Sequence, residues 1–208
     1  RAILSAARIN FFELKNYAKA ETFYIQLRKE ASSQENQLEA LRGLLRSQYQ
    51  LEKWEDAAGT GKDLLAAKGS SNDDKALANM AIGKSMAINN QHDQAIQHFR
   101  TVVQINKAAL AAEARYGIAD AWFALNKLAD AEKAAFEVIN KSGSYDYWVT
   151  KSYILLGDIY FRQKDYFNAK ATFQSVADNT IEPNLKKEAE TKLNQVKEEE
   201  SRNSRIDN

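Results

Sequence analysis

The chain has 208 residues, of which 27% are charged and 44% hydrophobic, with one proline, no cysteine and a net charge of +1. The missing cysteines exclude disulfides, thiolate metal sites and a cysteine nucleophile, and they leave the redox compartment undetermined. The small net charge argues against a nucleic-acid binder, which is usually clearly basic. No apolar run approaches the ~20 residues needed to cross a bilayer, so we expect no transmembrane segment.

Apolar residues recur at helical spacing in pairs of segments that are separated by short polar turns. Short turns require antiparallel neighbours, so the pattern predicts helical hairpins. A last segment, polar on all but one face, predicts a capping helix, and the final residues are expected to be disordered. In chain order we expect helices at 2–14 and 17–31, 34–51 and 54–68, a third pair across 74–106, then 108–125 and 128–141, 146–163 and 166–179, a capping helix at 184–200 and a disordered tail at 201–208.

The five hairpins are copies of one unit. Its anchor is a small residue that opens the second helix, and successive anchors are 36 to 38 residues apart. In the clearest copy, 153–176, Gly157 and Ala169 fall where the two helices approach most closely, so packing explains their small size. The predicted repeats are 1–33, 34–71, 72–107, 108–144 and 145–180, with the anchors Ala20, Ala57, Ala95, Ala131 and Ala169.

The unit resembles the tetratricopeptide repeat (TPR), which has about 34 residues, a small residue in each helix and aromatic residues beside them. The matching residues are Gly83, Ile82, Ala95 and Phe99 in one copy, and Gly157, Leu156, Tyr160, Ala169 and Phe173 in another. The resemblance covers residues 1–180 and implies an all-α fold, a right-handed α-α superhelix of five hairpins plus the capping helix. The chain departs from the family in its longer period and in lacking the closing proline of each repeat.

Longer, proline-poor repeats are similar to those of bacterial envelope proteins, including outer-membrane assembly factors. The chain opens at Arg1 without a basic-then-apolar leader, and we expect a processed chain or an excised fragment. A periplasmic or envelope-associated location is expected if a signal was removed, and a cytoplasmic location otherwise.

Residues 58–63 resemble a phosphate-binding loop. They lack its first glycine and the Ser or Thr after its lysine, and no strand precedes them. We therefore expect Gly59 and Gly61 to lie inside a helix, where they either weaken it or admit a close neighbour. Gly61 also stands where the sister repeats carry an aromatic residue.

Two further groups of polar residues are assigned structural roles. The oxygen-rich segment 71–74 lacks the glycine and distal glutamate of a calcium loop, which favours a helix cap. His92 and His98 lack the i, i+4 spacing of a zinc pair. His92 replaces the ring of its repeat, and His98 is expected at the surface. With no nucleophile motif and no metal set, we expect no enzyme, no catalytic residue, no metal and no cofactor.

The resemblance implies a groove for a partner, because the first helix of each repeat lines the concave side of a TPR array. Four rings, Phe12, Tyr49, Phe123 and Phe161, share one repeat position and would form a stripe along its wall. The alternative, that packing between repeats buries these rings, stays open because interfaces and cores favour the same residue types. The implied groove residues are Phe12, Arg42, Arg46, Tyr49, Lys84, Tyr116, Asp120, Phe123, Asp158, Phe161 and Arg162.

These features together predict a non-catalytic protein-binding scaffold that holds a peptide or protein on the concave face of the array. We expect no nucleic-acid partner, and the sequence sets no oligomeric state. One alternative is an architectural segment of a larger solenoid or an envelope assembly component, without a ligand groove of its own. Another is an accessory subunit with a small-molecule pocket.

Overall fold

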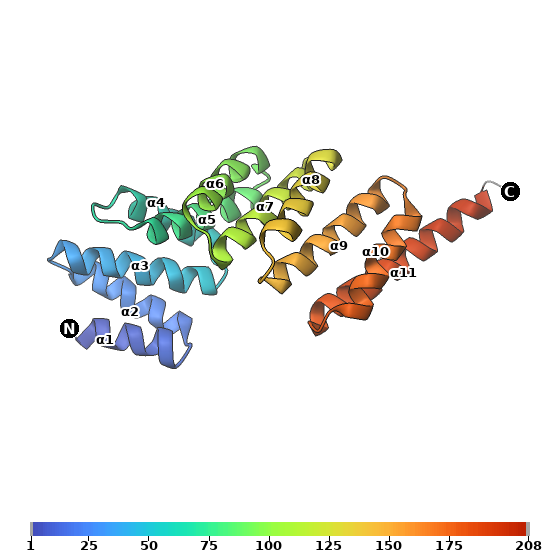
Figure 1. Cartoon of the computed structure of the whole chain (residues 1–208). Helices are drawn as coiled ribbons and strands as arrows, with labels where there is room; N and C mark the ends of the chain where they lie inside the picture. The colour runs from blue at the N-terminus through green and yellow to red at the C-terminus, as the bar shows by residue number, and fades with distance from the viewer. Residues whose placement is uncertain (1, 207–208) are drawn as a thin grey trace. The chain divides into compact units, whose positions relative to one another are not determined.

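The structure, a computed structural model, describes residues 2–206 of the chain, and within this range it contains no strand. The all-α fold of five helical hairpins and a terminal helix is confirmed (Figure 1). The elements are α1 (Ala2–Arg8) with the π-helical turn η1 (Ile9–Glu13), α2 (Tyr17–Glu30), α3 (Gln34–Gln50), α4 (Trp54–Ala66), α5 (Asn72–Ile88), α6 (His92–Ile105), α7 (Ala109–Ala124), α8 (Leu128–Lys141), α9 (Asp146–Arg162), α10 (Tyr166–Asn179) and α11 (Pro183–Ile206).

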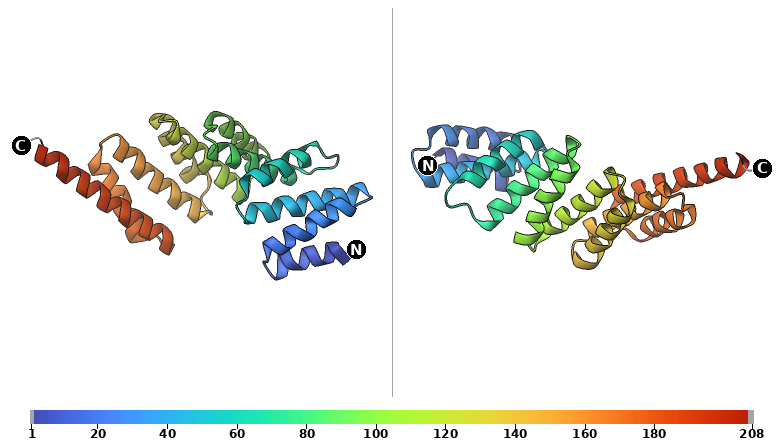
Figure 2. Two further views of the ribbon diagram at one scale, coloured as in Figure 1. Left: turned by 180° about the vertical axis from the view of Figure 1, so that it is seen from behind. Right: turned by 90° about the horizontal axis from the view of Figure 1, so that it is seen from above.

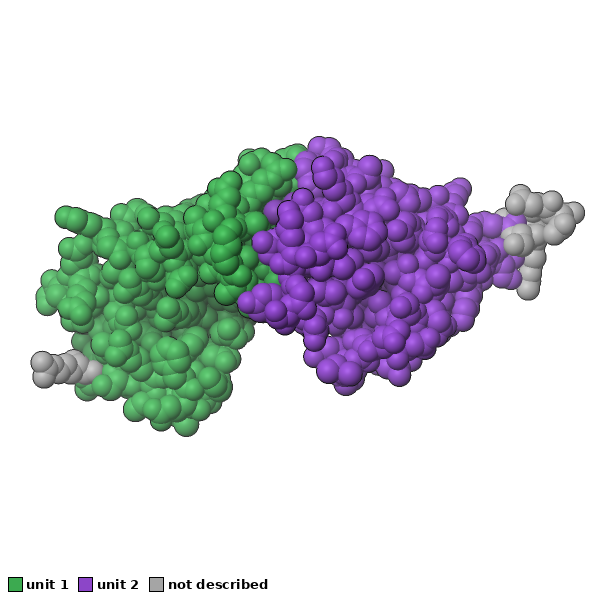
Figure 3. Space-filling view, viewed as in Figure 1, with its two compact units in different colours: residues 1–114 green, residues 115–208 purple. Residues whose placement is uncertain are grey.

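The chain divides into two compact units within α7, and each unit is described by itself. Unit 1 comprises Arg1–Ala114 and unit 2 comprises Arg115–Asn208 (Figure 3). We call the first helix of each hairpin helix A (α1 with η1, α3, α5, α7 and α9) and the second helix B (α2, α4, α6, α8 and α10). In unit 1, helices that follow one another from α1 to α6 pack as neighbours, and in unit 2 the same holds from α8 to α11 (Figure 2).

The turn between helix A and helix B is the same in all five hairpins. Each contains one residue with a left-handed backbone, with φ between 52° and 63°, and this residue always lies five positions before the anchor alanine. None of the five is glycine, and only the two asparagines are residues that favour this conformation, so the sequence gives no signal for it at the two lysines and the glutamate. The five residues are Lys15, Glu52, Asn90, Asn126 and Lys164.

The interior of each hairpin is built around the anchor alanine, which is fully buried in every copy. Except in the first repeat, where Arg8 and Tyr24 occupy these positions, the residues twelve positions before and four positions after the anchor compensate in size, because closely packed interiors accept a fixed volume rather than fixed residues. The pairs are Gly83 with Phe99, Gly157 with Phe173, Ala119 with Ala135, and, in reversed order of size, Leu45 with Gly61.

The two glycines inside α4 have different surroundings. A Cβ added to Gly61 would lie 3.2 Å from the carbonyl oxygen of Ala78 and 3.3 Å from its Cα, so this glycine lets α4 approach α5 closely. A Cβ added to Gly59 would meet no atom within 4 Å. The close neighbour expected from the sequence is therefore present at Gly61 and absent at Gly59, and α4 is continuous through both.

The first helix differs from the expected 2–14 segment. It is α-helical only to Arg8, and η1 continues it with a π-type hydrogen bond from the amide of Leu14 to the carbonyl of Ile9, 3.0 Å long. The side-chain amide of Asn10 donates to the carbonyl of Ala6 (2.8 Å) and competes there with the regular helical pattern.

The prediction of a disordered tail is wrong for residues 201–206, because α11 continues to Ile206. Two contacts hold its last turns: Lys170 pairs with Glu200 (2.5 Å), and the side-chain amide of Asn203 donates to the hydroxyl of Tyr166 (2.6 Å). Residues 207–208 lie outside the described part of the chain. The expected one-sided character of this helix is confirmed, since Leu185, Ala189, Leu193 and Val196 are buried and the opposite face is polar.

Candidate protein-binding surface

The residues proposed for the groove lie on helices A, and the structure places them in different environments within each unit. In unit 1, Phe12 has half of its surface exposed and Arg46 is exposed, whereas Arg42, Tyr49 and Lys84 are partly buried. The last three are engaged in contacts inside the protein.

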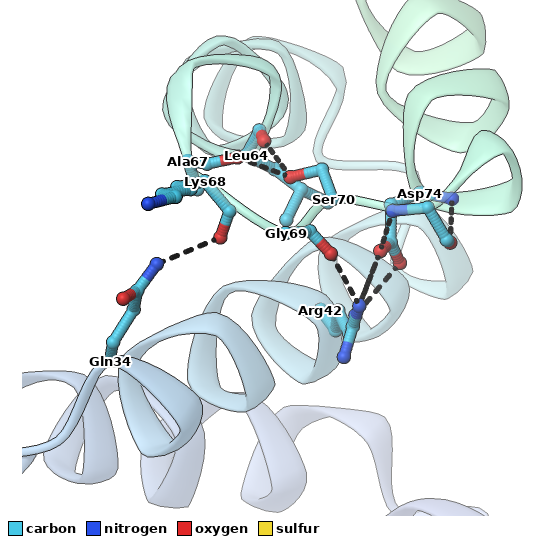
Figure 4. A network of polar contacts seen from close by, with 9 residues as sticks. Gln34, Arg42, Leu64, Ala67, Lys68, Gly69, Ser70 and Asp74 are labelled. Carbon is cyan, nitrogen blue, oxygen red and sulfur yellow. Dashed lines mark hydrogen bonds and ion pairs between the residues drawn. The ribbon is translucent and has the colours of Figure 1, made fainter.

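Arg42 holds the loop between the second and third repeats (Figure 4). Its Nε lies 3.0 Å and 2.9 Å from the two carboxylate oxygens of Asp74, its Nη2 lies 2.7 Å from Oδ2, and Nη2 also reaches the carbonyl of Gly69 at 3.4 Å. Asp74 in turn completes a capping box with Ser71, as expected for segment 71–74. Arg42 therefore contributes to packing between repeats, and its place in a groove stays a prediction.

The pKa of Asp74 reflects these contacts. Burial opposes ionisation of its carboxyl, but hydrogen bonds from Arg42 and Ser71 outweigh the burial and hold the pKa below the ordinary value of 3.8. The same loop is fastened by Ser70, whose hydroxyl donates to the carbonyl of Leu64 (2.5 Å), and by Gln34, whose side-chain amide donates to the carbonyl of Lys68 (3.1 Å) (Figure 4). Gly69 has a left-handed backbone (φ 94°), the conformation that glycine commonly adopts just after the end of a helix.

Tyr49 and Lys84 belong to a cluster of two rings and an ion pair. The ring of Tyr49 meets Trp54 edge to face, with 5.1 Å between centroids, and Lys84 Nζ lies 4.6 Å from the Trp54 centroid. Lys84 also pairs with Glu113 at 2.5 Å. Burial, with a smaller effect of the Glu113 carboxylate, raises the pKa of Tyr49 well above its ordinary value. The faces of these two rings are therefore in contact with a cation of the protein itself, the ammonium group of Lys84.

In unit 2, Tyr116 and Asp158 lie near α11. Tyr116 packs on Trp148 with 5.4 Å between centroids, and burial together with nearby carboxylates raises its pKa. Both carboxylate oxygens of Asp158 accept from Lys192 of α11 at 2.8 Å. Burial raises the pKa of Asp158 despite the charge of Lys192. Asp158 is therefore paired with α11 and keeps 22% of its side chain exposed, and its place in a groove stays a prediction.

Phe123, Phe161 and Arg162 form contacts at the turn end of their helices. The guanidinium of Arg162 stacks 3.7 Å from the centroid of Phe123 and donates to its carbonyl at 3.0 Å. Phe161 lies 6.0 Å from the ring of Tyr166, and both Phe123 and Phe161 are partly buried, whereas Asp120 is exposed. Of the four rings at the shared position, Phe12 alone is exposed, and the other three are partly covered by neighbours.

Comparison with known proteins agrees with the geometry. Two tetratricopeptide-repeat family models match the chain, at residues 81–146 and 150–178. Both stretches of this chain therefore contain tetratricopeptide repeats. The crystal structure of a thermophilic TPR protein from Thermus thermophilus has a similar fold, with a TM-score of 0.59 and 16% identity, over 92% of this chain and 97% of that chain. No curated protein sequence matches the chain significantly.

TPR repeats generally serve as protein-interaction scaffolds without enzymatic activity. In the described part of this TPR chain, no group of three or more His, Cys, Asp or Glu side chains could hold a metal ion. None of the helices there is both long and apolar enough to span a membrane.

His98, expected at the surface, is half-buried, and its Nδ1 lies 2.8 Å from the side-chain oxygen of Asn79.

The sequence reasoning missed a series of ion pairs between successive helices A of the TPR units. Arg8 pairs with Glu39 (2.7 Å), as Lys84 does with Glu113, and both glutamates lie eighteen residues before the anchor of their own repeat. The sequence signal for these pairs was a basic residue eleven or twelve positions before one anchor, together with a glutamate eighteen positions before the anchor of the next repeat.

Proposed function

We propose that this TPR protein holds a peptide or protein partner on the helix-A surface of unit 1. This surface consists of residues that lie eleven, eight or seven positions before an anchor and therefore share one face of their helices. It combines apolar side chains with a cation: Ile9 is 43%, Phe12 50% and Ile88 61% exposed, and Arg46 and Gln50 are exposed beside Tyr49. Exposed apolar residues that lie on this one face of the helices A, although at different repeat positions, are the observation that supports this proposal.

The charges narrow the chemistry of this surface. Arg42 forms an ion pair with Asp74, and Lys84 forms one with Glu113. Among the basic groove residues of unit 1, Arg46 is therefore the exposed cation. A partner would thus place apolar side chains against Phe12 and Ile88 and a hydrogen-bond acceptor near Arg46. Aromatic and arginine side chains commonly supply most of the binding energy at interfaces. In unit 2, Asp120, Phe123 and Arg162 are the corresponding candidates on their own helix-A surface.

The test is a pull-down with the immobilised full chain, in which captured proteins are identified by mass spectrometry. Phe12→Ala and Arg46→Glu should each remove the same specific partner. The matched controls are Ile25→Ala, a 51% exposed residue of helix B, and Lys29→Glu, an exposed residue of the same helix. Loss of the partner with the controls, or its retention with both helix-A variants, would contradict the proposal.

One observation favours an architectural role as a second candidate. Arg42, Lys84 and Asp158 all direct their charges to neighbouring helices, as expected for a segment that mainly joins repeats. Under this alternative, a partner that is captured would be insensitive to both helix-A variants and sensitive to changes on helices B.

A further inference from the structure

Helix α11 occupies the place of a sixth helix A. Its buried residues Ala189, Leu193 and Val196 follow the spacing of Ala78, Ile82 and Ser85 in α5, and like a helix A it packs mainly on the preceding helix B, α10, with additional contacts to α9. The ribbons of α10 and α11 run side by side in each view (Figures 1 and 2). The outer face of α11, opposite these buried residues, is polar and exposed.

The contact between α11 and the hairpin below it has an apolar centre. Leu185, Ala189, Leu193 and Val196 pack into one cluster with side chains from α9 and α10, among them Ile154, Phe173 and Val176. The four α11 residues are spaced by four, four and three positions, which places them on a single helical stripe. Any helix that replaced α11 here would need the same stripe.

Three ion pairs run along this contact. Lys151 of α9 pairs with Glu188 (3.3 Å), Asp158 of α9 with Lys192 (2.8 Å), and Lys170 of α10 with Glu200 (2.5 Å). The surface beneath α11 therefore presents basic, acidic and basic groups in order. Helix α11 presents the complementary acidic, basic and acidic groups. This charge order fixes both the direction and the register of α11 on the surface.

We propose that this surface of α9 and α10 is a binding site for an amphipathic helix with inner charges in the order acidic, basic, acidic, and that α11 is its resident occupant. The occupant can leave without disrupting the rest of unit 2, because helical repeats contact only their neighbours and, within the described residues, α11 packs on α10 and α9 alone. α11 is joined to α10 by three residues, 180–182, and its pairing charges are 21–38% exposed. The site is built from residues other than those of the helix-A surface of unit 1, so it does not depend on the function proposed above.

The resident helix and a helix in trans compete for the same site. A short linker gives α11 an effective concentration of about millimolar, so a free helix binds measurably only when α11 is loosened. Charge reversal of Glu188→Lys with Lys192→Glu in the full chain should loosen it, because each reversed group then faces a like charge on α9. The matched control, Lys187→Glu with Glu190→Lys, reverses two exposed charges on the outer face of α11 and keeps the same net charge.

The experiment uses a fluorescent peptide with the sequence of residues 183–203, titrated into each full-chain variant and followed by anisotropy. The peptide should bind the Glu188→Lys, Lys192→Glu variant at least ten times more tightly than the control variant. A peptide that itself carries Glu188→Lys and Lys192→Glu should not bind any of the proteins. Hydrogen exchange should show α11 amides exchanging at least ten times faster in the loosened variant, with α9 unchanged.

Three results would overturn the proposal. In the first, the α11 amides of the Glu188→Lys, Lys192→Glu variant exchange as slowly as those of the control variant. In the second, these amides exchange faster but the variant does not bind the peptide. In the third, the peptide binds all variants equally tightly. If the double reversal also exposes α9 amides, Leu193→Asn replaces it, since it weakens only the apolar stripe, and the same criteria apply. The charge order can be checked by adding Lys151→Glu to the Glu188→Lys variant. The exchanged pair again joins opposite charges, so the α11 amides should regain their protection from hydrogen exchange.

Discussion

The ring of Phe173 fills the space beside Gly157 in which a side chain would otherwise lie. A Cβ built on Gly157 would be 2.5 Å from Cε1 of that ring and 2.6 Å from Cζ, closer than real Cβ contacts. Phe99 covers Gly83 in the same way in the third repeat, whereas Tyr24 covers Gly43 of the following helix A. The aromatic residue of helix B thus requires a glycine opposite it, although the glycine can belong to the same repeat or to the next.

This contact predicts the effect of enlarging the small residues. Gly157→Leu and Ala169→Leu should each lower the free energy of unfolding by about 1–3 kcal/mol, because the added atoms force α9 and α10 apart. Urea denaturation measures the change. Leucine at Gln174, an exposed position of α10, is the control and should alter stability by less than about 0.5 kcal/mol. Unchanged stability of both core variants would contradict the repeat alignment.

The two glycines of α4 should respond in opposite directions to alanine. Gly59→Ala should stabilise the protein by about 0.5–1 kcal/mol, because it adds helix propensity in open space. Gly61→Ala should destabilise it, because the new methyl group meets the backbone of Ala78. Thermal unfolding of the two variants decides this, and hydrogen exchange of residues 57–65 should slow only in the first. The same sign for both would show that α4 and α5 do not approach closely at Gly61.

The left-handed turn residues offer a stabilising substitution. Lys164 has a φ of 63°, which strains any residue with a Cβ, so Lys164→Gly should raise the free energy of unfolding by up to about 1 kcal/mol. The neighbouring Gln163 has a φ of −77°, and Gln163→Gly should lower it by a similar amount. Chemical denaturation at neutral pH compares the pair. Destabilisation by both changes would argue against the shared turn.

Asp74 and Asp158 should titrate on opposite sides of the ordinary carboxyl pKa. The pKa of Asp74 is lowered on folding, so its contribution to stability is complete above the unfolded pKa of about 3.9 and is lost as the pH falls through the folded pKa. The stability difference between the parent and Asp74→Asn should therefore shrink below about pH 4. The pKa of Asp158 is raised, so folding favours its protonated form and the linkage has the opposite sign. NMR titration of the two carboxyl groups checks both directions.

Truncation of three phenylalanines should separate exposed rings from core rings. Phe12→Ala should change the free energy of unfolding by less than about 0.5 kcal/mol because half of the ring is exposed, whereas Phe173→Ala should cost about 3–5 kcal/mol. Phe123→Ala should fall between them, since the ring is partly buried and stacks with Arg162. A large loss for Phe12 would place it in the core and remove it from the proposed surface.

The repeat pattern could be predicted from the sequence because it is set by the spacing of residues along single helices. The anchors Ala20 to Ala169, the five hairpins and the cap at 71–74 all follow from local periodicity and turn chemistry. The left-handed turns at Lys15, Glu52 and Lys164 could not be predicted, since these residues have no preference for this conformation and the packing of the two helices holds them in it, whereas Asn90 and Asn126 are residues that favour it.

The residues available to a partner were decided only by the tertiary structure. Arg42 and Arg46 lie one helical turn apart and look equivalent in the sequence, yet Arg42 pairs with Asp74, 32 residues away in the chain, and Arg46 stays exposed. Such pairs depend on how neighbouring helices are oriented and on the reach of long side chains, neither of which is encoded in the spacing within one helix. For the same reason, the sequence alone could not show that α11 covers Asp158.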